Sequence, residues 1–147
     1  MAIGDNQIGT EGAILKRSSQ CLTLTGAIPT TGLVLDIRIP RGALVSHIDF
    51  FTDTVATGSE TIDVGWTEGK FNLPGTQTGL VDEAADADGF GTLSNANLKS
   101  LGRNAIYGGA GLQKKRFTAP VFVTLTPSAA TTQTAGNMIF NLYYVVD

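Results

Sequence analysis

The chain has 147 residues, a formal net charge of −3, and charged side chains at only 16% of its positions. This length is that of one domain with a sizeable core, and the small acidic excess argues against a surface that grips nucleic acid through its phosphates. The single cysteine, Cys21, excludes an intramolecular disulfide, and we interpret it as a small residue of a strand.

Residues 1–11 are polar and rich in glycine, with Ile3 and Ile8 as isolated apolar positions. Such a segment buries too little apolar surface to order by itself. We therefore expect either a frayed terminus or an extended arm that lies on another subunit, with the two isoleucines as its anchors. The predicted organisation is an arm, residues 1–11, and a single β domain, residues 12–147.

Three consecutive strands are predicted by the alternation of apolar and polar residues with a period of two. They cover residues 33–39, 44–51 and 61–66, and Pro40-Arg41-Gly42 forms the turn between the first two. Trp66, at the end of the third strand, has apolar parity and is expected in the core.

The middle strand has the clearest assignment of faces. One set of residues is expected to point into the core and the other to point outward. The inward set is Leu44, Ile48 and Phe50, and the outward set is His47, Asp49 and Phe51.

From about residue 76 to residue 111 the chain is rich in Gly, Asp, Asn and Ala. We expect a long loop with short helical pieces, for which the two candidates cover residues 80–86 and 92–101. A loop of this length inside a compact domain is uncommon and usually functional.

The last predicted strand, residues 137–146, is apolar on both faces. Met138, Phe140, Leu142 and Tyr144 share one face, and Ile139, Tyr143 and Val145 the other. A strand of this kind is covered on both sides, so we expect its second cover to be either the 76–111 segment or a neighbouring subunit. Residues 121–125, which include Phe122, repeat the pattern more weakly.

About eight short strands separated by turns, with little helix, predict an all-β antiparallel sandwich. With one long loop and short-helix insertion at about 76–111, the arrangement is closest to a jelly roll. The start of the chain lacks the pattern of a signal peptide, and its apolar runs are too short to cross a bilayer, so we expect a soluble protein.

Catalytic patterns are missing from the sequence. His47 is the only histidine, and no serine lies in a nucleophile-elbow motif. The run from Asp86 to Gly89 matches the middle of a calcium-binding loop, but Asn95 stands where the closing glutamate belongs. We therefore predict a protein that is not an enzyme and has no metal site and no cofactor.

Three short stretches resemble small virion proteins of tailed bacteriophages: Pro40 to Ala43, Thr61 to Gly65 and Asp86 to Phe90. The resemblance covers roughly residues 33–91. It implies a jelly roll and, for some members, a capsid decoration (cement) protein that sits as a trimer on the capsid exterior and clamps neighbouring major capsid subunits. It identifies no functional residues.

Residues and resemblance together predict a cement protein that is made in the host cytoplasm and stabilises the phage head. Its expected partners are copies of itself, as a homotrimer, and the major capsid protein, with no nucleic acid and no membrane. The predicted interface residues are Ile3, Ile8, Phe122, Tyr143 and Val145. Two alternatives are a tail or head-fibre-associated virion protein and a carbohydrate-binding jelly-roll module, for which Tyr107 is the loop aromatic to test.

Overall fold

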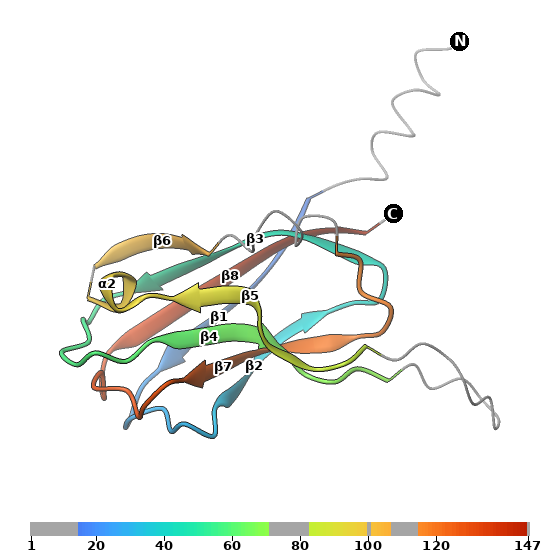
Figure 1. Ribbon diagram of the computed structural model, residues 1–147. Coiled ribbons are helices and arrows are strands. Elements are labelled where there is room, and N and C mark those ends of the chain that lie inside the picture. The colour runs from blue at the N-terminus through green and yellow to red at the C-terminus, as the bar shows by residue number, and fades with distance from the viewer. Residues whose placement is uncertain (1–14, 71–82, 100, 107–114, 147) are drawn as a thin grey trace, which may run out of the picture.

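A computed structural model describes residues 15–70, 83–99, 101–106 and 115–146 of the chain. These residues form two antiparallel four-stranded sheets packed face to face (Figure 1). The strands are β1 (Lys16–Thr23), β2 (Leu33–Ile39), β3 (Ala43–Thr52), β4 (Ile62–Trp66), β5 (Asp86–Leu93), β6 (Gly102–Ile106), β7 (Val121–Pro127) and β8 (Asn137–Val146).

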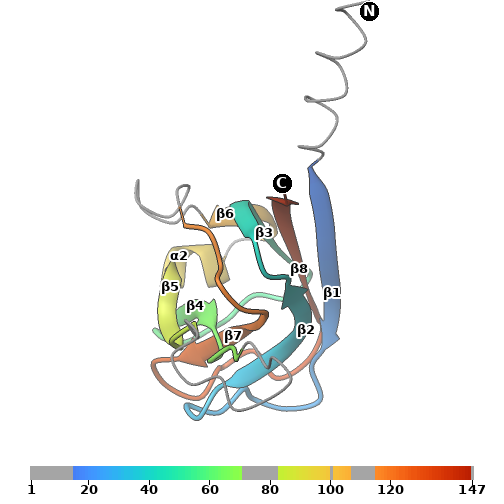
Figure 2. The same ribbon diagram turned by 90° about the vertical axis from the view of Figure 1, so that its right-hand side faces the viewer.

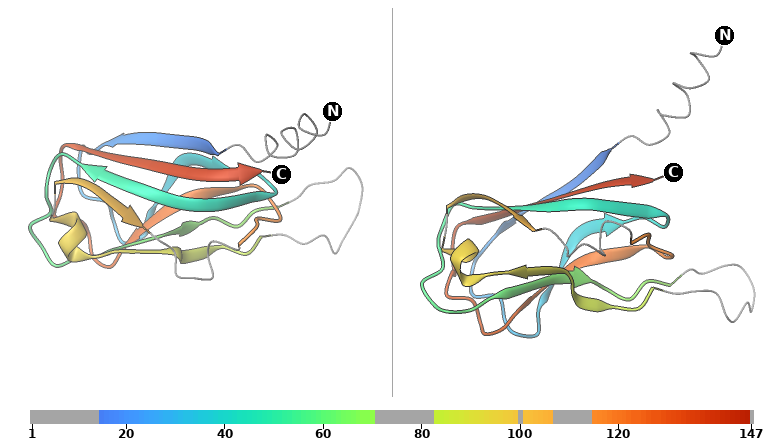
Figure 3. Two further views of the ribbon diagram at one scale, coloured as in Figure 1. Left: turned by 90° about the horizontal axis from the view of Figure 1, so that it is seen from above. Right: turned by 45° about the horizontal axis from the view of Figure 1, so that its top comes forward.

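The order of the strands identifies the topology. One sheet has the order β1-β8-β3-β6 and the other β2-β7-β4-β5, and Figure 3 shows the two layers from above. Consecutive strands alternate between the sheets except at the β4–β5 hairpin, which is the interleaved arrangement of an eight-stranded jelly roll. The predicted fold class, an antiparallel jelly-roll-like sandwich, is confirmed.

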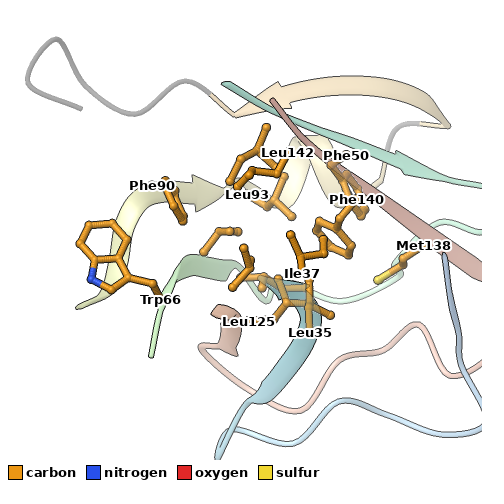
Figure 4. Close-up of a cluster of buried hydrophobic side chains, with 14 of the residues drawn as sticks. Leu35, Ile37, Phe50, Trp66, Phe90, Leu93, Leu125, Met138, Phe140 and Leu142 are labelled. Atoms are coloured by element: carbon orange, nitrogen blue, oxygen red, sulfur yellow. The ribbon is translucent and has the colours of Figure 1, made fainter. Parts of the chain in front are cut away.

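The core lies between the sheets and is built from the inward residues of each strand (Figure 4). Phe50 of β3 and Phe140 of β8 are fully buried, with ring centroids 5.2 Å apart. At one end, Trp66 packs edge-on against Phe90 and Phe117, at centroid distances of 4.9 Å each. The prediction that Trp66 belongs to the core is therefore confirmed.

The assignment of faces in β3 needs one correction. The register of β3 with β8 shifts between Val45 and His47, which marks a β-bulge. Because a bulge adds one residue to a strand, it reverses the inward and outward parity beyond it. Val45 is therefore buried, whereas Leu44, expected inside with Ile48, is only half-buried and lies on the outer side.

The region 76–111 also holds more regular structure than expected. Its described part contains strands β5 and β6 and the short helix α2 (Asn95–Leu98) between them. The helix lies inside the predicted range 92–101 and is capped by Ser94, whose side chain accepts a hydrogen bond from the backbone of Asn97. The other predicted helical piece, 80–86, is not helical in its described residues 83–86, where Glu83 forms an isolated bridge with Gly69 and β5 begins. Strands β5 and β6 were missed because their Gly, Asp and Asn residues have low β-propensity.

Candidate interaction surface

The outer side of the β1-β8-β3-β6 sheet carries the strongest candidate site. We call it the β8–β3 face and define it by Leu44, His47, Phe51, Ile139, Tyr143 and Val145. The register pairs these residues across the two strands as Phe51 with Ile139, His47 with Tyr143, and Leu44 with Val145. Figure 2 shows β8 between β1 and β3 in this sheet.

Apolar surface remains open to solvent along this face. Phe51 is 41% exposed, and the other five residues are half-buried. Strands β5 and β6, the described strands of the 76–111 region, belong to the two sheets and do not lie over this face. A contiguous apolar stretch of this kind is typical of a surface that another chain covers.

An aromatic pair divides the face into two parts. The His47 and Tyr143 rings stack with centroids 4.3 Å apart and an interplanar angle of 14°. The Ser46 hydroxyl lies 3.1 Å from Nδ1 of His47. The stack stands between two shallow hollows in the surface.

The first hollow, of about 230 Å³, is lined by Asp49, Phe51, Ile139 and Asn141. The second, of about 360 Å³, is lined by Leu15, Leu44, Val45, Ser46 and Val145. The first is smaller than a typical small-molecule pocket, and the second is near the lower end of that range. They are better suited to single aliphatic side chains of a partner.

Cationic side chains stand at both margins of the β8–β3 face. Arg17 of β1 pairs with Tyr143 and is exposed. On the other margin, Arg116 forms an isolated bridge with Leu44, and its guanidinium donates a 2.7 Å hydrogen bond to the Gly42 carbonyl. Asp49 points toward the same face but is only 3% exposed.

The five predicted interface residues do not form one patch. Tyr143 and Val145 lie together on the β8–β3 face, whereas Phe122 lies on the outer side of the other sheet, where it is 37% exposed and pairs with Arg38. Ile3 and Ile8 fall outside the described residues, as do the rest of the arm 1–11 and Tyr107. Leu44 was not predicted on this face, because the bulge is not visible in the alternation of residues. Phe51 was not predicted as an interface residue either, although its outward parity was a usable signal.

Glu83 has a structural role at one end of the sandwich. It forms a salt bridge with Lys115 and accepts hydrogen bonds from the Thr118 backbone N–H and hydroxyl, at 3.1 and 2.8 Å. Burial raises the pKa of Glu83, but these hydrogen bonds outweigh burial and leave the pKa below its ordinary value. Glu83 thereby ties the β4–β5 hairpin to the segment that leads into β7.

Two further carboxylates hold loops in the same manner. Burial raises the pKa of Glu60, yet hydrogen bonds from the backbone and hydroxyl of Thr132, both 2.7 Å, lower it overall. A hydrogen bond from the Asn137 backbone lowers the pKa of Asp53. These carboxylates stay ionised and already accept hydrogen bonds from the protein, so they are suited to fixing loops in place rather than to transferring protons.

Within the described ranges, no group of three or more His, Cys, Asp and Glu side chains is placed to hold a metal ion. Asp86 and Asp88, from the run that partly matched a calcium loop, lie in β5 and are exposed. Among all the residues that the structure describes, no helix has the length and apolar character needed to span a membrane.

No family model and no curated protein matches the chain. Among solved structures, it is similar to a chain of the cyanophage Pam1 capsid asymmetric unit, with a TM-score of 0.64 and 19% identity over 92% of this chain and 87% of that one. It is also similar to a chain of the capsid of Ralstonia phage GP4, with a TM-score of 0.59 and 16% identity over 91% and 85% of the two chains. At these identities the likeness shows a shared fold.

Proposed function

We propose that this protein is a virion component of a tailed bacteriophage, a capsid decoration (cement) protein that stabilises the head by bridging major capsid subunits. The observation that carries the proposal is a jelly roll that matches chains from two phage capsids over nine tenths of its length and leaves an apolar sheet face exposed. The stretches resembling small virion proteins support the same assignment.

A bridging protein needs at least two separate contact surfaces, and the predicted interface residues divide in that way. Tyr143 and Val145 lie on the β8–β3 face, and Phe122 lies on the opposite side of the sandwich. We assign the β8–β3 face to contact between copies of this chain, as a homotrimer, and the face with Phe122 to the major capsid protein on the capsid exterior.

The proposed stabilisation follows from mass action. A protein that binds the assembled shell and not its dissociated subunits shifts the equilibrium toward the shell. Many copies on a symmetric lattice add avidity when each copy contacts more than one subunit.

Immunogold labelling of virions from the phage that encodes this chain tests the assignment. The expected result is dense label over the whole head. Label confined to the tail or fibres would overturn the cement role in favour of a fibre-associated protein, and purified virions without the chain would overturn both. Heads stripped of the protein should open at lower temperature and recover when it is added back, whereas a Phe122→Lys variant should fail to rebind.

A further inference from the structure

We infer that the β8–β3 face is the seat for residues 3–8 from a second copy of this chain, with Ile3 and Ile8 filling the two hollows. This inference rests on the proposed function, because it specifies the contact between copies assigned above. Three observations carry it: the spacing of the hollows, the charge at their margins and the direction of β1.

The spacing of the hollows matches the spacing of the two isoleucines. Along β8, the first hollow is lined by Ile139 and Asn141 and the second by Val145. Their separation of four to six residues corresponds to about 13–20 Å at the rise of a strand. Ile3 and Ile8 are five positions apart, which is about 17 Å in an extended chain.

The local backbone permits both side chains to face the sheet. In a regular strand, residues five positions apart point to opposite sides. Gly4 lies between the two isoleucines, and glycine adopts conformations that break this alternation without steric cost. The segment can therefore lie across the face as an extended, irregular chain.

Charge also favours this occupant. Residues 1–14 contain two carboxylates, Asp5 and Glu11, and no Lys, Arg or His. The face is flanked by the cationic side chains of Arg17 and Arg116. Opposite charges at the margin of an apolar contact orient a partner and raise its rate of association.

The direction of β1 assigns the segment to a second copy. Leu15 lines the second hollow, and Lys16 pairs with Tyr144 near the end of β8. Strand β1 begins at this end of the sheet and runs toward the opposite end. To reach its own molecule's β8–β3 face, a segment before Leu15 has to reverse direction at once, whereas reaching the face of a second copy requires no such reversal.

Disulfide trapping tests the inference with the native cysteine. Cys21 is exposed and pairs with Ile139 at the first hollow. Under mild oxidation by diamide, either the Ile3→Cys or the Ile8→Cys variant, whichever places its anchor in that hollow, should give covalent dimers and trimers on a non-reducing gel. Their yield should exceed that of a Gly12→Cys variant at least tenfold, and the added Cys21→Ser substitution should abolish them.

The outcomes separate the alternatives. A disulfide within one chain, seen as a faster-migrating monomer, would show that residues 3–8 cover the sheet of their own molecule. This result would overturn the inference that they bind a second copy. Multimers at the level of the Gly12→Cys control for both variants would overturn the seat itself. The purified protein alone is used, so either failure leaves the virion labelling result intact, and unlabelled virions would refute the proposed function even where the disulfide forms.

Discussion

The imidazole of His47 and the phenol ring of Tyr143 stack face to face, with centroids 4.3 Å apart, on the outer side of the β1-β8-β3-β6 sheet. The β-bulge in β3 creates this pair. Val45 pairs with Tyr144, so a regular ladder would place Ser46 opposite Tyr143, but the register shift places His47 there instead. The one extra residue of the bulge thus places His47 in the stack with Tyr143 and also turns Leu44 to the outer side of the sheet.

The β8–β3 face is predicted to carry self-association. Replacing Tyr143 and Val145 together with glutamate places charges in a contact that must lose water, which is costly when no partner compensates. Light scattering should give the mass of a monomer, with an unchanged circular dichroism spectrum. A Phe122→Glu variant, altered on the opposite side of the sandwich, should keep the oligomeric mass. A folded double variant with the wild-type mass would contradict the assignment.

Gly65 is predicted to be intolerant of any side chain. A Cβ at this position would overlap backbone atoms of Asp86 and Ala87 in β5, which cannot move aside without breaking the β4–β5 pairing. Gly65→Ala should lower the free energy of unfolding by about 2 kcal/mol or more. Gly26→Ala, where the added Cβ meets no atom within 4 Å, should change it by less than about 0.5 kcal/mol. Urea denaturation of both variants measures the difference, and equal values would contradict the packing argument.

The period-two alternation predicted strands that bury one face and expose the other, such as residues 33–39. In these strands every second side chain faces the core, so the apolar residues themselves alternate. Strand β5 could not be predicted in this way. Its residues Asp86 to Gly91 have weak intrinsic preference for a strand, and the pairing with β4 depends on the close approach at Gly65.

The candidate site was predictable to a similar degree. Outward parity correctly indicated that Tyr143, Val145 and Phe122 leave the core. Parity does not say which sheet a strand joins, so the placement of Phe122 on the opposite side needed the topology. The bulge that turns Leu44 outward has no signature in the alternation of nearby residues.

Phenylalanine residues of the core and of the outer face should respond differently to truncation. Phe140 is fully buried against Phe50, so Phe140→Ala leaves a cavity and should cost about 3–5 kcal/mol of stability. Phe51 is 41% exposed, and Phe51→Ala should cost less than about 1.5 kcal/mol while weakening self-association. Thermal denaturation and sedimentation of the two variants measure both effects. A large loss of stability in Phe51→Ala would show that this ring belongs to the core.

The salt bridge between Glu83 and Lys115 should make stability depend on pH below the ordinary pKa of a glutamate. Because hydrogen bonds from Lys115 and Thr118 outweigh burial and lower the pKa of Glu83 in the folded state, ionised Glu83 contributes its full stabilisation above the unfolded-state pKa of about 4.3. That contribution is lost as the pH falls through the lower, folded-state pKa. Glu83→Gln should therefore lower the free energy of unfolding by about 1–3 kcal/mol at pH 7, and the difference from wild type should shrink in acid.

Glu68→Gln serves as the control, because it alters an ion pair with Lys70 in which both side chains are exposed. It should lower the free energy of unfolding by less than about 1 kcal/mol. Urea denaturation at pH 7 and in acid checks both variants, and a Glu83→Gln effect that persists unchanged in acid would show that the loss comes from packing rather than from the charge.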